Sequence, residues 1–382
     1  MAQQKYIHLA NVLTVGNKVE KADHLKCVQD GRASSLETFW KQREIEKVLD
    51  ANPDIRLFLD SGAHSLLNAK AGLINSSGIV KSVKTIENHG EAEFTADEFA
   101  NLPIAERAAL AAGGRGMIQK FVDWSFTEDE DVKQYLDAYI EFIHKYEKQL
   151  LGYVNLDIIY NAERSWINQE YMESHGLRPV PVFHHEEDFK WLKKYVDEYE
   201  YIGIGGVATG LGMEAFLGFA DACFEIIGYE HPKVQVHGFA VTSFDMMFRY
   251  PWYSVDSTSW LKHAAYGNVI VPRWSEVLND FDLGRSPMTA TVSNVALIKP
   301  TKGTTIHYTK KYSPHERERI ELWFEQCGTC FVGPNSDGTL PGVGVGDILL
   351  DRQRVNIHYY DQLLKKGIVV DAARAHGNKV FF

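Results

Sequence analysis

A short apolar strand followed by a helix recurs along this chain of 382 residues, and this alternation restricts the folds open to it. Amphipathic patterns of helical period separate the strand-like runs, as over Thr127–Leu150 and Met213–Ile227. Strands alternating with helices of this length predict parallel βα units, and we expect an α/β fold built on a (β/α)8 (TIM) barrel with insertions. The main strand-like runs are Ile55–Leu59, Gly152–Leu156, Pro179–Phe183, Tyr201–Ile204 and Val234–Thr242.

Polar or glycine residues follow these strands instead of preceding them. In a (β/α)8 barrel that position is the face on which active sites are built. Each residue has an ordinary explanation when taken alone; Asp256, for example, would also suit an N-cap, since Asp-Ser-Thr-Ser is good capping and turn chemistry. Taken together, they favour a functional site. The set is Asp60, Asp157, His184, Gly205, Gly206 and Asp256.

The length is sufficient for a barrel and an appended part. We expect a catalytic barrel over residues 1–285, with an insertion at about 67–119, and a C-terminal part over residues 286–382. The glycine run Gly113–Gly116 lacks the lysine and spacing of a P-loop, so it is interpreted as a loop or hinge. Near the N-terminus, the pattern predicts a helix around Leu36–Leu49.

The composition limits the cellular compartment and the kinds of partner that we expect. No apolar run approaches membrane-spanning length, and Met1–Gly16 lacks the layout of a signal peptide. Four cysteines fit a reducing compartment better than a disulfide framework, so we expect a cytoplasmic protein without a membrane partner. A formal net charge of −11 argues against nucleic-acid binding by the whole surface, although a local basic patch remains open.

One segment is locally basic. Between residues 285 and 319 there are seven Lys or Arg against two Glu, a local excess of five positive charges. His307, Tyr308 and Tyr312 are interleaved with them, a combination that suits phosphate contacts and base stacking. The alternative is a solvated hairpin. The basic residues are Arg285, Lys299, Lys302, Lys310, Lys311, Arg317 and Arg319.

Several short motifs resemble those of one enzyme family. Asp60-Ser61-Gly62, after a buried strand, resembles the Asp-Ser-Gly-Gly-Phe-Gln motif of the tRNA-guanine transglycosylases. Tyr201–Gly206 is similar to their Ala-Ile-Gly-Gly stretch, and Val236–Ser243 with Tyr253–Asp256 resembles their Gly-Thr-Pro and Phe-Asp-Cys segments. The motifs occur in the family order over roughly residues 55–260. The sequence looks closest to the viral and bacterial paralogues (DpdA-type) that install 7-deazaguanine bases in DNA.

This resemblance implies a base exchange. Asp256 matches the nucleophile that attacks C1′ of the nucleotide, expels guanine and forms a covalent glycosyl-enzyme, and Asp60 matches the general acid/base. Two carboxylates about a sugar can divide these roles, as in retaining glycosidases. Asp157 can accept hydrogen bonds from the N1–H and the amine of a guanine-like base, and the N–H groups of Gly205 and Gly206 can reach its carbonyl oxygen.

The implied base site also includes Ser61, His64 and His184. His64 stands where the family usually has an aromatic residue that stacks on the base, and His184 stands where the family has a glutamine. Around the mouth of the site, Arg249 and Lys262 would hold an extruded nucleotide. The expected nucleic-acid contacts are Arg249, Lys262, Lys299, Lys302, Lys310 and Lys311.

The C-terminal part carries a metal-like motif. Cys327 and Cys330 have Cys-x2-Cys spacing, and His358 lies on a helix predicted over Asp351–Lys366, a pattern typical of zinc sites. The family has a further cysteine where this chain has Glu325. We therefore expect a C-terminal zinc-binding subdomain, with a structural Zn²⁺ on Cys327, Cys330, His358 and Glu325. His315 and His307 are alternative fourth ligands, and two ordinary buried thiols are the alternative to any metal.

The favoured hypothesis is a DNA guanine transglycosylase, a pentosyltransferase that inserts a 7-deazaguanine base such as preQ0. A phage-encoded protein would act in the host cytoplasm, and a homodimer is left open. The same reaction on tRNA is the first alternative, since only the resemblance favours DNA. A barrel glycoside hydrolase using Asp60 and Asp256 is the second, and a non-catalytic nucleic-acid-binding barrel is the third. The two carboxylates argue against the third, and the basic segment argues against the second.

Overall fold

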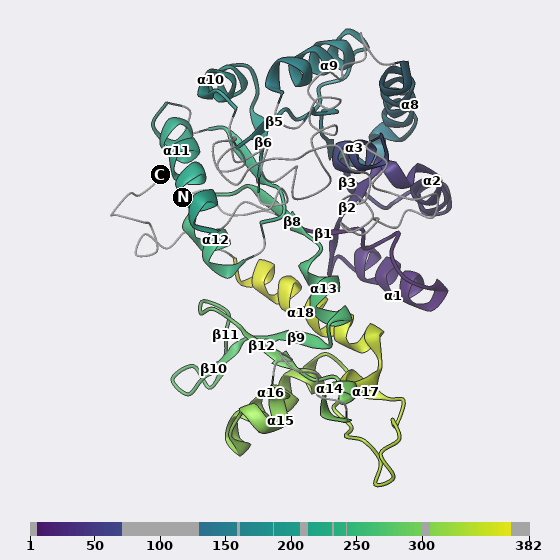
Figure 1. Ribbon diagram of the computed structural model, residues 1–382, viewed down its shortest axis with the longest axis vertical. Helices are drawn as coiled ribbons and strands as arrows, with labels where there is room; N and C mark the ends of the chain where they lie inside the picture. Colours follow the sequence, from purple (N-terminus) through teal and green to yellow (C-terminus); the bar gives the residue numbers. More distant parts are fainter. Residues whose placement is uncertain are drawn as a thin grey trace, which may run out of the picture. The chain divides into compact units, whose positions relative to one another are not determined.

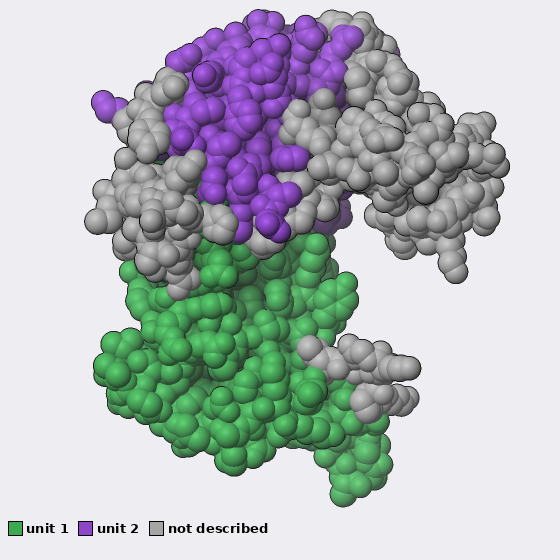
Figure 2. All heavy atoms as spheres, turned by 60° about the vertical axis from the view of Figure 1, so that its left-hand side comes forward, with its two compact units in different colours: residues 1–34, 241–380 green, residues 35–240, 381–382 purple. Residues whose placement is uncertain are grey.

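The computed structural model describes residues 6–70, 130–158, 161–185, 187–206, 213–230, 233–241, 243–298 and 306–367. Most of the insertion expected at 67–119, with its glycine run, lies outside these residues. The chain divides into two compact units, residues 1–34 with 241–380 and residues 35–240 with 381–382 (Figure 2). Within the described ranges, no helix combines the length and apolar character needed to cross a bilayer.

Eight parallel strands form one curled sheet in the order β4-β3-β2-β1-β8-β7-β6-β5 (Figure 1). Adjacent strands are neighbours in the sequence, except that the first strand, β1, pairs with the last, β8, as in a (β/α)8 barrel. The α/β prediction is confirmed, and the sheet is barrel-like. The strands are β1 (Tyr6–Ala10), β2 (Ser34–Thr38), β3 (Leu57–Asp60), β4 (Leu150–Tyr153), β5 (Val182–His184), β6 (Tyr201–Gly205), β7 (Gln235–Gly238) and β8 (Ser254–Ser257).

The two outer strands of this order also meet. An isolated parallel bridge joins Val154, just after β4, to Val180, just before β5. The N–H of Asn155 donates to the Val180 carbonyl at 3.0 Å, and the N–H of Val180 donates to the Tyr153 carbonyl at 2.8 Å. These backbone bonds join the two edges of the sheet at a single point.

Helices connect the successive strands, and α10 shows how an apolar stripe buries one face of such a helix. In α10, Asp188 is the N-cap and accepts the N–H of Lys190, while Leu192, Tyr195 and Val196 are buried at helical spacing. The connecting helices are α1 (Lys18–Gln29), α2 (Gln42–Ala51), α3 (Ala63–Lys70), α8 (Glu130–Tyr146), α9 (Ala162–Ser174), α10 (Phe189–Glu198), α11 (Met213–Glu230) and α12 (Phe244–Arg249).

The helix predicted around Leu36–Leu49 is wrong in its first part, because residues 34–38 form β2 and α2 begins only at Gln42. Ser35 and Glu37 lie on one face of β2, both fully buried, and the Ser35 hydroxyl donates to Glu37 Oε1 at 2.8 Å. The polar sequence of β2 has none of the apolar alternation that marks a strand. Its conformation is set by parallel pairing with β3.

Rings from non-neighbouring strands fill the inside of the curl. Phe58 of β3 stacks at 5.0 Å on His237 of β7 and lies 6.0 Å from Tyr201 of β6. A Cβ on Gly152 of β4 would lie 2.8 Å from the Phe58 ring, so glycine is required there. Because side chains alternate along a strand, Asp60 shares the inner face with Phe58.

After β8 the chain forms two small two-stranded sheets, β9 with β12 and β10 with β11, and several helices. Helix α18 packs against α13 and β9 (Figure 1). Helix α16 begins with the capping box of Ser313 and Glu316. These elements are α13 (Ser259–Ala265), β9 (Asn268–Val271), β10 (Arg273–Ser275), β11 (Asp280–Asp282), β12 (Met288–Thr291), α14 (Asn294–Ile298), α15 (Tyr308–Lys311), α16 (Pro314–Gln326), α17 (Gly344–Asp347) and α18 (Leu349–Lys366).

The buried face of α18 carries polar side chains that are bonded to backbone. Arg352 donates from Nε to the Ala264 carbonyl at 2.8 Å and from Nη1 to the Val345 carbonyl at 2.9 Å. Asn356 accepts the N–H of Ile270 at 2.8 Å and donates to the Trp260 carbonyl at 2.9 Å. These bonds fix α18 to its neighbours.

Candidate functional site

The ends of β4 and β5 bring two ionisable side chains together. Asp157 follows β4, His184 ends β5, and His184 Nε2 lies 2.7 Å from Asp157 Oδ2. Both residues are only 7% exposed. Burial lowers the pKa of His184, but the hydrogen bond to Asp157 and the charges of Asp157 and Glu187 outweigh it, so the pKa lies above its usual value. The contact with Asp157 therefore favours the imidazolium form of His184.

The neighbouring strand explains why the imidazole fits. Gly205 of β6 is in register with His184, and a Cβ on Gly205 would lie 2.6 Å from His184 Nδ1. Any larger residue would displace the ring. Gly206 has a φ of +137°, a conformation that residues with side chains rarely adopt. Both glycines are thus required by the local geometry.

Glu187, which the sequence did not single out, completes the cluster. Its Oε2 accepts the backbone N–H of His184 at 2.9 Å. Among the described residues, Glu187 Oε1 and His184 Nδ1 are buried atoms without a hydrogen-bond partner. Burial raises the pKa of Glu187 to about 7, against the opposing charge of His184. The available sequence signal was the acidic run after β5, which we interpreted only as the start of a helix.

Asp60 is held at the end of β3 by its own turn. Its Oδ2 accepts the N–H of Gly62 at 3.1 Å. The hydroxyl of Tyr135, on α8, donates to the Ser61 carbonyl at 2.7 Å and would lie 2.6 Å from a Cβ on Gly62. Burial raises the pKa of Tyr135, and so does the charge of Asp60. Ser61 itself is fully buried, with its Oγ accepting the N–H of Ala63 at 3.4 Å.

The electrostatic couplings place Asp60 and Asp157 in one neighbourhood. Tyr139 of α8 donates to the Val154 carbonyl at 2.9 Å, and its pKa is raised by burial and by the charges of both carboxylates, among others. His64, in the first turn of α3, has an exposed side chain whose partial desolvation lowers its pKa against the charge of Asp157. Asp60, His64, Asp157, His184 and Glu187 are therefore the candidate site of the second unit.

Asp256 belongs to the first unit, and it lies inside β8 with 7% exposure. It does not cap the next helix, whose N-cap is Thr258. Asp256 is in register with His8 of β1, so the two side chains share a face of neighbouring strands. His8 is buried, with Nδ1 2.8 Å from Ser34 Oγ. The sequence analysis missed His8 because it lies within an apolar run.

The expected nucleic-acid contacts differ in exposure. Arg249 is buried, at 6%, and its Nε donates to the Tyr250 hydroxyl at 2.9 Å. Lys262 on α13 and Lys310 and Lys311 on α15 are exposed. Lys299 and Lys302 lie outside the described residues. Three of the six side chains are thus open to a phosphate.

The candidate zinc ligands are spread over α16, the segment after it and α18. Cys327 is the C-cap of α16, Cys330 and Glu325 are exposed, and His358 packs on Trp323 with 4.8 Å between ring centroids. Burial raises the pKa of the Cys327 thiol. In the described parts of the chain, no three His, Cys, Asp or Glu side chains form a group that could hold a metal ion. The donor types suit zinc.

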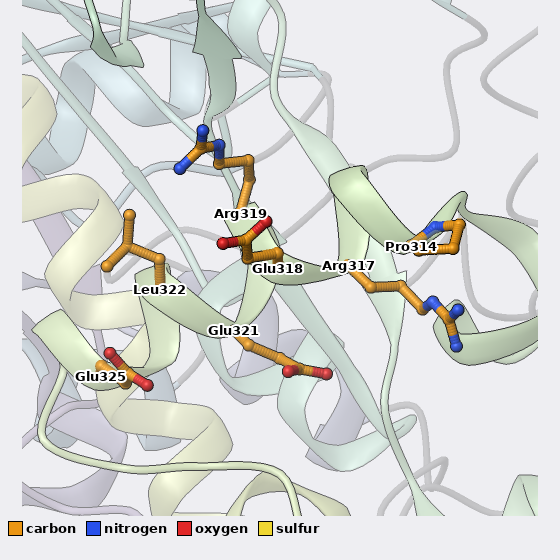
Figure 3. Close-up of a pocket in the computed structure, with 7 residues that line it drawn as sticks. All are labelled: Pro314, Arg317, Glu318, Arg319, Glu321, Leu322 and Glu325. Carbon is orange, nitrogen blue, oxygen red and sulfur yellow. The ribbon is translucent and has the colours of Figure 1, made fainter.

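A pocket lies along α16 (Figure 3). Its lining combines arginines and glutamates without a histidine, and none of the strand-end residues belongs to it. Arg317 and Arg319 of the basic segment and Glu325 of the predicted zinc set are the predicted residues that line it. The lining residues are Pro314, Arg317, Glu318, Arg319, Glu321, Leu322 and Glu325.

No family model matches this sequence, and no curated protein matches it.

Proposed function

We propose that this protein is a base-exchange transglycosylase that replaces guanine in DNA with a 7-deazaguanine base such as preQ0. The supporting observation is the buried Asp157–His184 pair at the ends of β4 and β5. His184 occupies Asp157 Oδ2, and no described residue donates a hydrogen bond to Oδ1. A fixed carboxylate with one free oxygen is suited to the adjacent N–H donors of a guanine-like base.

The proposed reaction has two displacements at C1′ of the sugar. A carboxylate oxygen of Asp256 forms a bond to C1′ while the bond to guanine breaks, and Asp60 gives the departing base a proton. Asp60 then takes a proton from the incoming base, whose nitrogen displaces Asp256. The roles of these residues come from the motif resemblance. Their positions at strand ends support the proposal, because barrel enzymes build active sites there.

The deciding experiment is base exchange with labelled preQ0 or guanine, using either duplex DNA or tRNA as the acceptor. Asp256→Asn should lower exchange by about a thousandfold or more, because the covalent step is lost. Asp280→Asn, an exposed carboxylate of the same unit, is the matched control and should retain activity. Full activity in folded Asp256→Asn would refute the nucleophile. Exchange into tRNA but not into DNA would show that the substrate is tRNA, the first alternative.

Zinc binding by Cys327, Cys330 and His358 stays a separate prediction. A metal ion can assemble ligands that do not converge without it, because binding and local folding are coupled. Elemental analysis of protein purified without chelators should give about one zinc per chain, and a Cys327→Ser, Cys330→Ser variant should give none. A wild-type protein without zinc would leave the two cysteines as ordinary thiols.

A further inference from the structure

The Asp157–His184–Glu187 cluster contains more hydrogen-bonding capacity than the described residues satisfy. His184 uses Nε2 and its backbone N–H, for Asp157 and Glu187. His184 Nδ1 and Glu187 Oε1 remain buried without a partner in the described chain. Unpaired buried polar atoms cost stability, so native proteins keep them mainly where they have a role.

We propose that Glu187 stores a proton for this site and takes one up from solvent when a base binds to Asp157. The inference rests on the proposed binding of a guanine-like base at Asp157. With Asp157 negative and His184 positive, a neutral Glu187 gives the cluster no net charge. An ionised Glu187 would leave one buried negative charge without a counterion.

Base binding should favour the neutral form for a physical reason. A planar base over Asp157 would exclude water from the cluster, and an ionised carboxylate loses more stabilisation than a neutral acid when water leaves. Glu187 Oε1 has no donor among the described residues that would offset this loss. The pKa of Glu187, already about 7, should therefore rise further in the complex.

Other titratable groups surround Glu187. Tyr195 of α10 has its pKa raised by burial and by the charges of Glu187 and Asp157, so it stays neutral near pH 7. His64 of α3 is coupled to Asp157. From β6, Gly205 contributes no titratable side chain. His184, with its raised pKa, is the competing proton carrier, and the test must separate it from Glu187.

Titration calorimetry of preQ0 binding to the full chain, in phosphate and in Tris at pH 7, measures the protons exchanged. A group with a pKa near 7 is about half protonated at that pH, so the wild-type protein should take up about 0.4 proton per base. Affinity should be about sevenfold higher at pH 6 than at pH 8.5 if the pKa rises by about one unit. Glu187→Gln should abolish both effects, so that any change in its affinity for preQ0 is the same at both pH values.

Glu198→Gln is the matched control. Glu198 is the last residue of α10, and this variant should behave as wild type. Uptake that persists in Glu187→Gln but disappears in His184→Gln would overturn the assignment to Glu187. Wild-type binding without proton uptake would overturn the inference and leave the proposed function standing. A wild-type protein that binds neither preQ0 nor guanine at any pH between 6 and 8.5 would remove both.

Discussion

Two regions of this molecule bury polar side chains, and they differ in how those side chains are satisfied. On α18, Arg352 and Asn356 direct their donors to backbone carbonyls, and Asn356 also accepts a backbone N–H. At the strand ends, His184 and Glu187 each leave one atom without a partner among the described residues. Completed bonds, like those of Arg352 and Asn356, are typical of structural positions. The unpaired atoms of His184 and Glu187 belong to a cluster bonded to Asp157, where a ligand could supply the missing partners.

The difference separates stability from binding. Substitution of Arg352 or Asn356 should change the free energy of unfolding, because these two side chains already have their partners. Substitutions in the strand-end cluster should change ligand affinity or its pH dependence, and disturb the fold less.

The largest expected effect is on α18. Arg352→Met removes two short hydrogen bonds donated by a buried charged group, to the Ala264 and Val345 carbonyls, so the free energy of unfolding should fall by about 2–4 kcal/mol. Arg354→Met is the control on the same helix, and its half-exposed ion pair with Asp23 should contribute about 1 kcal/mol or less. Denaturant unfolding measures both. Equal losses of unfolding free energy in the two variants would show that the buried hydrogen bonds of Arg352 stabilise the fold no more than the exposed ion pair of Arg354.

The next effect is on binding. Asp157→Asn replaces an acceptor oxygen with a donor, facing His184 or the N–H groups of the base, and preQ0 affinity should fall by about 1.5–3 kcal/mol, roughly 10- to 150-fold. The midpoint of unfolding should change less than in Arg352→Met. Calorimetric titration beside a thermal melt compares the two quantities. The opposite result, in which Asp157→Asn is mostly unfolded but its folded fraction binds preQ0 as tightly as wild type, would show that Asp157 stabilises the fold and does not bind the base.

The smallest effect is a pH-dependent one. The pKa of Glu187 is raised to about 7 in the folded protein, so its contribution to stability is complete below its unfolded pKa and is lost as pH rises through 7. Glu187→Gln has no such loss. Its stability relative to wild type should therefore increase by about 2 kcal/mol between pH 5 and pH 8. Parallel melts at the two pH values test the sign, and a variant whose relative stability falls between them would contradict it.

Local patterns in the sequence were sufficient for much of the fold. The period of the apolar residues located β3 and the helices α8 and α11. It also placed Asp60 and His184 at strand ends. These features depend on residues close together in the chain, which is why a single sequence reveals them.

The remaining features depend on contacts between distant segments. Strand β2 is polar and takes its conformation from pairing with β3. The register that sets His8 beside Asp256 joins segments about 250 residues apart, and no local pattern encodes it. Glu187 has an unusual pKa only because β5 and the segment after β4 enclose it. The spacing of Cys327 and Cys330 is local, whereas the position of His358 relative to them is tertiary.

The single bridge between the edges of the sheet has a consequence for motion. β4 and β5 each pair with their other neighbour over three registered residues, but with each other only through Val154 and Val180. This joint should open more readily than the rest of the sheet, and the amides of Asn155 and Val180 should exchange with solvent first. The Asp157–His184 hydrogen bond connects the same two strand ends and adds to the single bridge. A ligand that competes for Asp157 would weaken this hydrogen bond, so ligand binding and local opening of the sheet between β4 and β5 should be coupled.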